Sequence, residues 1–278
     1  MLFSMDSPEK RKVALITGAS SGIGQATALA LAKRGYAVGL LARRAERLEE
    51  VAQACGQAGG EGLVLPGDVA QRDQVDQAVA RTVERFGRLD VMVNNAGYGV
   101  FASVMDLEEK DLRRVFEVNF YGVWYGTVAA ARVMAAQRSG HIFNISSVIG
   151  KRGTPFHGAY CATKFAVGGL TESARVELRP LGVHVTLVCP AMTRTEFFNQ
   201  GSMARRAGRA FSRFNRQMDP EPIGEAIART AGRRKPEMVF TLGGKLLALI
   251  SALSPRVADG MMEMYRRELL AVMNGGHD

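Results

Sequence analysis

Residues 14–35, ALITGASSGIGQATALALAKRG, combine an apolar run, a glycine-rich turn and an Ala/Leu-rich segment. The apolar run is typical of a buried strand, and the segment after the turn is typical of a helix. Gly18, Gly22 and Gly24 lie between them with the spacing G-x-x-x-G-x-G. Small residues at this place let backbone N–H groups and the helix N-terminus approach a pyrophosphate. The stretch therefore predicts a strand–turn–helix unit that binds a dinucleotide.

The rest of the chain repeats this alternation of apolar runs and longer helical patterns. Buried strands are predicted at 12–17, 37–42, 62–67, 89–94, 141–146 and 184–189, with a seventh at 237–241. Helices are predicted at 22–33, 44–54, 71–86, 107–137 and 159–179. Strands that are apolar along nearly their whole length are expected where helices cover both faces of a parallel sheet. The sequence thus predicts an α/β fold, a doubly wound, Rossmann-like parallel sheet of about seven strands with helices on both faces.

No internal repeat, low-complexity tract or long linker divides the chain, so residues 1–278 are expected to form a single domain. Within it, residues 1–10 are expected to be an N-terminal tail. Residues 192–218 follow the sixth strand and are expected to form a substrate lid, because open α/β sheets bind ligands at that end. The lid mixes Phe and Met with Arg, which fits either an apolar pocket beside an anionic group or an amphipathic segment with its arginines in water.

Residues 242–278 are expected to form a C-terminal extension. Most of it is apolar, and the charged residues around the apolar part include Lys245, Arg256, Arg266 and Arg267. Three roles fit this pattern: closing the substrate pocket, packing in an oligomer, or resting weakly on a membrane surface.

Composition and charge narrow the classes of function. Of the 278 residues, 47% are hydrophobic and 23% are charged, which is typical of a soluble globular protein. The net charge of +9 suits anionic ligands, but no nucleic-acid-binding motif accompanies it. Three cysteines without a C-x-x-C pair and four scattered histidines predict neither a disulfide scaffold nor a metal site. No signal peptide and no apolar run of membrane-spanning length is recognised, so a cytoplasmic protein is expected.

The end of the second predicted strand bears on the choice of cofactor. An acidic residue there would bind the ribose 2′-hydroxyl of NAD, whereas this chain has Arg43 and Arg44 and no carboxylate before Glu46. An arginine can pair with the 2′-phosphate of NADP, which an aspartate would repel. The sequence therefore favours NADP(H) over NAD(H).

Five motifs, in order along the chain, resemble those of the short-chain dehydrogenase/reductase family. They are TGASSGIG at 17–24, NNAG at 94–97, Asn119 in FEVNF, Ser147 in NISSVIG, and YCATK at 160–164. Ser147 precedes Tyr160 by 13 positions, which matches the family spacing and selects Ser147 over Ser146. The resemblance covers about residues 11–200 and points to the NADP-preferring type, with the TGxxxGxG and YxxxK motifs.

The resemblance implies a catalytic set of Asn119, Ser147, Tyr160 and Lys164. Tyr160 and Lys164 are four residues apart, so they are neighbours on one helix face. Tyr160 is the expected acid/base, and a nearby ammonium from Lys164 favours its phenolate. Lys164 is also expected to hydrogen-bond the nicotinamide ribose, Ser147 to stabilise the substrate oxygen, and Asn119 to take part in a proton relay through water.

The resemblance also implies a set of cofactor-binding residues. One departure is that Pro190 is followed by Ala191 where the family usually has Pro-Gly, although Thr195 still occupies the position that usually contacts the nicotinamide carboxamide. The full expected set is Gly18, Ser20, Ser21, Gly22, Ile23, Gly24, Arg43, Arg44, Asp68, Val69, Asn95, Ala96, Gly97, Tyr160, Lys164, Pro190, Thr193 and Thr195.

The function expected from these patterns is NADP(H)-dependent hydride transfer between the nicotinamide and a carbonyl or secondary alcohol of a hydrophobic small substrate. A homodimer or homotetramer that packs through 107–137 and 159–179 is what the resemblance implies. Two alternatives stay open. One is an NADPH-binding regulatory protein without significant turnover, and the other is a peripheral membrane-associated reductase of the lipid or steroid type.

Overall fold

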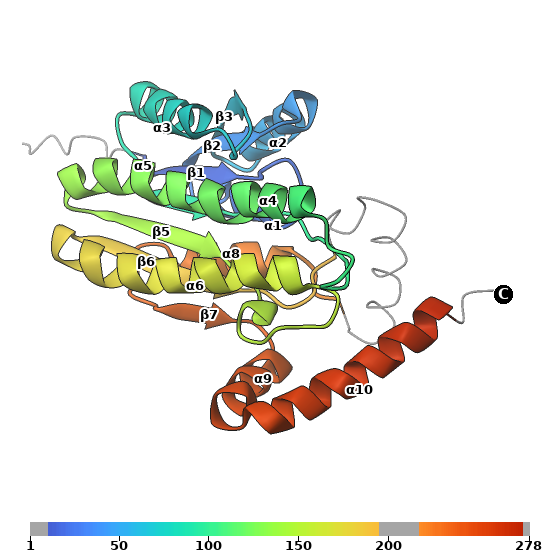
Figure 1. Ribbon diagram of the computed structural model, residues 1–278. Helices are drawn as coiled ribbons and strands as arrows, with labels where there is room; N and C mark the ends of the chain where they lie inside the picture. The colour runs from blue at the N-terminus through green and yellow to red at the C-terminus, as the bar shows by residue number, and fades with distance from the viewer. Residues whose placement is uncertain (1–10, 195–216, 275–278) are drawn as a thin grey trace, which may run out of the picture.

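Seven parallel strands form the centre of the molecule (Figure 1), which is a computed structural model that describes residues 11–194 and 217–274. Their order is β3-β2-β1-β4-β5-β6-β7, so the chain winds outward from β1 in both directions and the predicted doubly wound sheet is confirmed. The strands are β1 Val13–Thr17, β2 Ala37–Ala42, β3 Glu61–Pro66, β4 Val91–Asn94, β5 Gly140–Ile145, β6 Val183–Cys189 and β7 Glu237–Val239.

Helices cover both faces of this sheet, as the apolar strands predict. One face carries α1 Gly22–Ala32, α2 Ala45–Gln57 and α8 Glu221–Thr230. The other carries α3 Arg72–Phe86, α4 Glu109–Phe116, α5 Gly122–Gln137 and α6 Gly158–Leu178. Neighbouring side chains of one strand point to opposite faces, so Leu15 packs in one apolar core while Ile16 packs in the other.

The predicted helix at 107–137 differs in the structure. It begins at Glu109 and is divided by a π-helical turn over Glu117–Tyr121, where the N–H of Gly122 bonds the carbonyl of Glu117, five residues back. The turn places Asn119 in the interior, with its side chain fully buried. One extra residue in a single turn does not alter the apolar periodicity enough to be recognised in the sequence.

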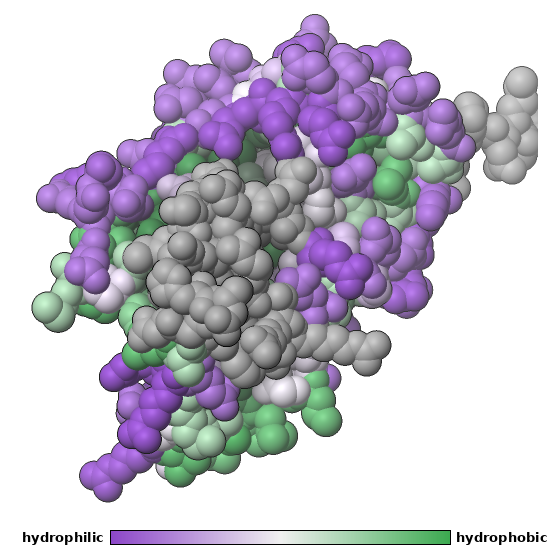
Figure 2. All heavy atoms as spheres, turned by 90° about the vertical axis from the view of Figure 1, so that its right-hand side faces the viewer, coloured by the Kyte–Doolittle hydropathy of each residue, from purple (hydrophilic) through white to green (hydrophobic). Residues whose placement is uncertain are grey.

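Two helices follow β7 that the sequence does not predict as such. They are α9 Leu242–Leu253 and α10 Pro255–Asn274, which lie below the sheet in Figure 1. Their exposed surface includes large apolar side chains, among them Leu242, Leu253 and Met264, and green side chains gather along the lower edge of Figure 2. None of the helices among the described residues is long and apolar enough to cross a membrane.

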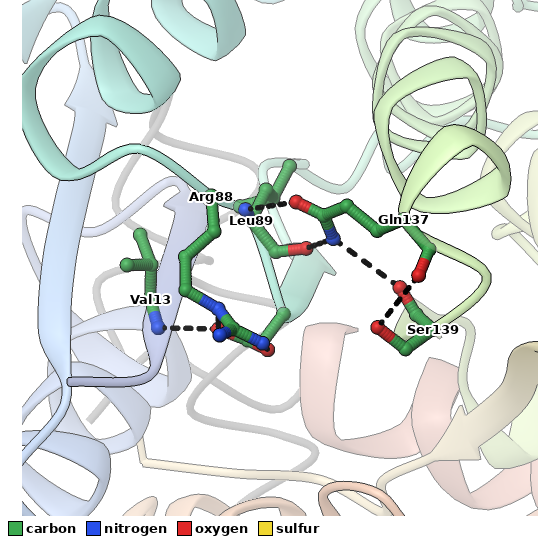
Figure 3. A network of polar contacts seen from close by, with 6 residues as sticks. Val13, Arg88, Leu89, Gln137 and Ser139 are labelled. Carbon is green, nitrogen blue, oxygen red and sulfur yellow. Dashed lines mark hydrogen bonds and ion pairs between the residues drawn. The ribbon is translucent and has the colours of Figure 1, made fainter. Parts of the chain in front are cut away.

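At the end of the sheet where the central strands begin, a network of hydrogen bonds holds the chain in place (Figure 3). The carboxylate of Asp90 accepts the N–H of Val13 at 2.8 Å and the Nε–H of Arg88 at 2.8 Å. The Gln137 side chain, at the end of α5, bonds both the N–H of Leu89 at 3.0 Å and its carbonyl at 2.8 Å. Both backbone groups of Leu89 are thus bonded to a side chain rather than to a neighbouring strand, and β4 begins at Val91 rather than at residue 89. This network lies away from the carboxyl ends of the strands, where a ligand site can form.

Candidate active site

A large cleft of about 1070 Å³ opens at the carboxyl ends of the strands, above the point where β1 lies between β2 and β4. Figure 2 views the molecule from this end, toward which β5 and β7 point in Figure 1. A topological switch point is where open α/β sheets bind ligands. The volume lies at the upper end of the range of small-molecule and cofactor sites, roughly 300–1,000 Å³.

The floor of the cleft is the glycine turn between β1 and α1. Gly18 and Gly22 have φ of 64° and 56°, a left-handed conformation that favours glycine. A Cβ on Gly24 would lie 2.2 Å from the carbonyl oxygen of Gly18, so only glycine permits this packing of helix against turn. The N-cap Ser21 makes no side-chain cap bond within the described chain, so the N–H groups of the first turn of α1 can meet an anion. The turn fits a pyrophosphate.

Asn95 and Thr17 hold this turn against the end of β4. The hydroxyl oxygen of Thr17 accepts the N–H of Asn95 at 2.9 Å and that of Ala96 at 3.0 Å. In return, the side-chain amide of Asn95 donates to the carbonyls of Thr17 at 2.9 Å and Gly18 at 3.2 Å. Thr17, the first residue of the TGASSGIG motif, thus braces the turn in a way that the glycine spacing alone does not reveal.

Arg43 and Arg44 follow β2 and line the cleft, with exposed side chains. Arg44 Nη2 donates to Ser20 Oγ at 3.1 Å, which joins the end of β2 to the glycine turn. No carboxylate from residues 42–45 accompanies them. The arrangement brings positive charge to the place where the sequence predicts a 2′-phosphate.

Asp68 and Val69 line the same end of the cleft. The Asp68 carboxylate pairs with Arg114 Nη2 at 2.7 Å and accepts the N–H of Ala70 at 3.0 Å. Burial raises the pKa of this carboxyl, but the two hydrogen bonds and the nearby charge of Arg114 outweigh burial and lower it overall. Asp68 is therefore an ionised acceptor fixed in place by Arg114, a partner that no sequence pattern indicates.

The Tyr160, Lys164 and Ser147 side chains converge on the other half of the cleft. Tyr160 and Lys164 come from the first turns of α6, and Ser147 follows β5. Ser147 and Tyr160 are hydrogen-bonded through their side chains, and Lys164 Nζ lies 5.5 Å from the centre of the Tyr160 ring. Lys164 Nζ also donates to the carbonyl of Ile145 at 2.9 Å, which draws the ammonium toward the sheet.

Burial dominates the electrostatics of this group. It raises the pKa of the Tyr160 hydroxyl, an effect that the hydrogen bond with Ser147 partly offsets. It lowers the pKa of Lys164 to about 8. Perturbed titratable groups that meet in a cleft are typical of a catalytic site.

Asn119 does not line the cleft but lies directly behind it. Its amide nitrogen donates to the carbonyl of Tyr98 at 2.8 Å and to Thr163 Oγ1 at 3.3 Å, and its amide oxygen accepts the N–H of Tyr98 at 3.0 Å. A Cβ on Gly97 would lie 3.1 Å from the Asn119 oxygen and 3.6 Å from Lys164 Nζ. The π-turn thus ties the loop after β4 to the helix that carries Tyr160 and Lys164.

The far side of the cleft is lined by residues outside the predicted catalytic and cofactor-binding sets. His157 is buried there, and burial lowers its pKa to about 4, so the ring is neutral at physiological pH. Met192 lies nearby, and Met262 and Tyr265 reach the cleft from α10. A four-then-three spacing of apolar residues on α10 is the signal that could have indicated them.

Most of the predicted site residues come together in this one cleft. Gly24 and Asn119 lie behind its lining and support it. Thr195 and most of the predicted lid, residues 195–216, lie outside the described part of the chain. The two described ends of the lid are joined, since the N–H of Met218 bonds the carbonyl of Met192 at 2.8 Å. The predicted residues that line the cleft are Gly18, Ser20, Ser21, Gly22, Ile23, Arg43, Arg44, Asp68, Val69, Asn95, Ala96, Gly97, Ser147, Tyr160, Lys164, Pro190 and Thr193.

Within residues 11–194 and 217–274, no group of His, Cys, Asp or Glu is placed to hold a metal ion. A turn suited to pyrophosphate and a buried Tyr–Lys pair share this cleft. The arrangement defines an oxidoreductase that uses a nicotinamide cofactor. The chain belongs to the short-chain dehydrogenase family, whose model, described as short chain dehydrogenase, matches residues 12–205. Helices α8, α9 and α10 lie beyond the matched segment.

Similar proteins agree with this assignment. An uncharacterized oxidoreductase of Bacillus subtilis, YxnA, is 35% identical over 257 residues, which cover 91% of this chain and 72% of the relative. A 3beta-hydroxysteroid dehydrogenase of Mediterraneibacter gnavus is 38% identical over 192 residues, 69% of each protein. The structure of an alcohol dehydrogenase from the archaeon Thermococcus sibiricus, complexed with 5-hydroxy-NADP, matches with a TM-score of 0.73 and 32% identity, covering 83% of this chain and 96% of that one.

Proposed function

We propose that this chain is an NADP(H)-dependent carbonyl reductase, or alcohol dehydrogenase in the reverse direction, that acts on a hydrophobic small substrate. The observation that carries the proposal is the convergence of Tyr160, Ser147 and Lys164 in one cleft with the glycine turn. When bound, the cofactor supplies the hydride and, in its oxidised form, a positive charge. The protein has to orient the substrate, exclude water and move one proton.

Tyr160 is the proposed acid/base. Because burial raises the pKa of its hydroxyl, Tyr160 holds its proton at neutral pH and can donate it to a substrate oxygen that gains negative charge. Ser147, already hydrogen-bonded to Tyr160, can donate to the same oxygen. Lys164 is proposed to favour the phenolate left after proton transfer and to bind the nicotinamide ribose, with its ammonium held between Ile145 and the Tyr160 ring.

Asn119 is proposed to support a proton relay as a positioning residue. Its side-chain amide is fully engaged with Tyr98 and Thr163, so it does not offer a free group to the substrate. It holds the loop after β4 close to Lys164, the residue from which we propose that the relay continues through water.

The preference for NADP(H) is proposed from Arg43 and Arg44. Both line the cleft at the end of β2, where guanidinium groups can pair with a 2′-phosphate. The relative from Thermococcus sibiricus, whose structure contains 5-hydroxy-NADP, is consistent with this proposal. The other nucleotide contacts proposed for this end of the cleft come from Asp68 and Val69 beside the adenine.

A homodimer or homotetramer is proposed as the working form. The π-turn, α5 and α6 expose Tyr121, Trp124 and Phe165, large aromatic residues that suit an interface between copies. Exposed apolar residues can instead make weak contact with a membrane surface. Leu246 and Leu249, exposed on the outer face of α9, favour this alternative. Sedimentation of the full chain with and without anionic lipid vesicles separates the two.

The experiment that tests the proposed function is NADPH oxidation over a panel of ketones, aldehydes, quinones and 3-oxoacyl thioesters. Tyr160→Phe should bind NADPH as the wild type does and lose about 10²–10⁴-fold in kcat, because the proton donor is gone. Tyr36→Phe is the matched control, since it removes a buried tyrosine hydroxyl outside the cleft. Full turnover in Tyr160→Phe would refute the proposed role. NADPH binding by the wild type with no turnover on any substrate would support the regulatory alternative.

A further inference from the structure

Helix α10 turns one narrow stripe toward the protein and most of its other residues toward solvent. The stripe recurs at four-, three- and four-residue steps, the repeat of one face of a helix, and consists of Ala258, Met262, Tyr265 and Leu269. Ala258 and Leu269 are fully buried, whereas Met262 and Tyr265 are partly buried and line the cleft. The inner face of α10 is therefore part of the cleft wall.

Aromatic and apolar side chains hold this stripe in place. Leu269 and Tyr265 pack with Phe101, Phe156 and Met192, three residues from segments that surround the mouth of the cleft. The Phe101 and Phe156 rings lie 5.5 Å apart, centre to centre. The α10 stripe is thus in contact with the loop after β4, the loop before α6 and the segment after β6.

Two further contacts attach the α9–α10 pair to the loop that carries Ser147. Gly244, in the first turn of α9, lies so close to Val148 that a Cβ there would be 2.6 Å from Val148 Cγ1. On α10, Asp259 pairs with Arg152, whose side chain is mostly buried in the same loop. The position of α10 is therefore coupled to the loop beside the reacting groups.

The two ends of the cleft differ in chemistry. Arginine and aspartate side chains line the end under β2 and β3, where the adenosine part of a dinucleotide fits. The opposite end, next to Tyr160, is lined by Leu247, Met261, Met262 and Tyr265 from α9 and α10. An apolar surface of this kind favours a substrate with an apolar substituent next to its carbonyl group.

We propose that α9 and α10 form the substrate wall of the cleft, and that Met262 and Tyr265 are specificity-determining residues that select an extended apolar substituent, with Asp259 as a positioning residue. The proposal rests on the proposed carbonyl reduction, because it names the part of the substrate that these side chains contact. Methionine suits this role, since its unbranched side chain adapts to the shape of an apolar group.

The test is the dependence of kcat/KM on chain length for methyl ketones from butanone to methyl decyl ketone. In the wild type, kcat/KM should rise by about fourfold per methylene until the wall is covered. Tyr265→Ala and Met262→Ala should each flatten this rise, with a loss of about tenfold for the longest ketone and less than about twofold for butanone. Tyr265→Phe keeps the ring and should keep the rise, while NADPH affinity should stay unchanged in all three variants.

Asp259→Asn tests the positioning role and should raise KM for the longest ketone without changing kcat for butanone. Glu263→Gln is its matched control, because among the described residues Glu263 pairs with Arg266 and Arg267 of the same helix. An undiminished chain-length dependence in folded Tyr265→Ala and Met262→Ala would overturn this inference and leave the proposed function standing. A wild type that reduces no ketone, aldehyde, quinone or thioester would overturn both.

Discussion

Replacing Thr17 by valine tests how the cofactor turn is held. The Thr17 side chain is 2% exposed, and valine has nearly the same shape without the hydroxyl. The substitution removes the acceptor of two N–H groups, those of Asn95 at 2.9 Å and Ala96 at 3.0 Å. An unsatisfied buried donor costs about 1–3 kcal/mol. Because Asn95 and Ala96 are only partly buried, the low end applies to each and the expected loss in free energy of unfolding is about 2–3 kcal/mol.

For a chain of this size, about 1 kcal/mol corresponds to a change of roughly 2–4 °C in Tm, so Thr17→Val should lower Tm by about 5–10 °C. The affinity for NADPH should fall as well, because the turn at Gly18 is held through the same residues. Thermal unfolding and NADPH fluorescence titration measure the two effects.

Two controls isolate the hydroxyl acceptor. Thr17→Ser retains the oxygen and should preserve most of Tm and NADPH affinity. Thr27→Val removes another buried hydroxyl, three residues after this motif, that donates at 2.7 Å to the carbonyl of Ile23 within α1, and should cost much less. If Thr17→Val unfolds at the temperature of Thr17→Ser and binds NADPH equally well, the bracing of the turn by this hydroxyl is refuted.

The remaining predictions concern charge. Burial lowers the pKa of Lys164 to about 8, so its ammonium is present below that pH and lost above it. The value of kcat/KM for reduction should therefore be constant near neutral pH and fall above about pH 8. Lys164→Arg should move this fall in kcat/KM to higher pH. A wild-type profile flat to pH 10 would contradict this. Arg43→Asp should weaken NADPH binding by about 10–100-fold and leave NADH binding little changed, as titrations of both cofactors would show. Arg47→Asp, an equal charge change on α2, should alter neither, and equal losses for both cofactors in Arg43→Asp would argue against the 2′-phosphate contact.

The sheet could be predicted from sequence because its strands are buried on both sides. A strand such as β2, with all six residues buried, has no polar face and can only lie inside a two-sided sheet. The strand ends were harder to predict. Leu89 continues the apolar run of β4 in the sequence, but in the folded chain Gln137 bonds both backbone groups of Leu89, and the strand begins at Val91.

The cofactor half of the site followed from motifs, and the substrate half did not. Gly18, Tyr160 and Lys164 belong to patterns of fixed spacing, because short-range geometry fixes their chemistry. Arg114 and Tyr265 reach the cleft only through tertiary packing, from helices whose sequences carry no motif. The ion pair that joins Arg114 to Asp68 forms only once α4 and the loop after β3 have come together in the folded chain.

The π-turn at Glu117–Tyr121 holds one residue more than a turn of regular α-helix. The five-residue hydrogen bond widens this single turn, so the added residue is absorbed there and α5 continues with its register unchanged. Removing one residue near Asn119 should therefore close the turn into an ordinary α-helical one and leave Val123 in its apolar core. Such a deletion would instead remove the bulge that carries the Asn119 amide to the backbone of Tyr98. The fold should therefore survive the deletion, whereas the bridge from the loop after β4 to α6 should be lost.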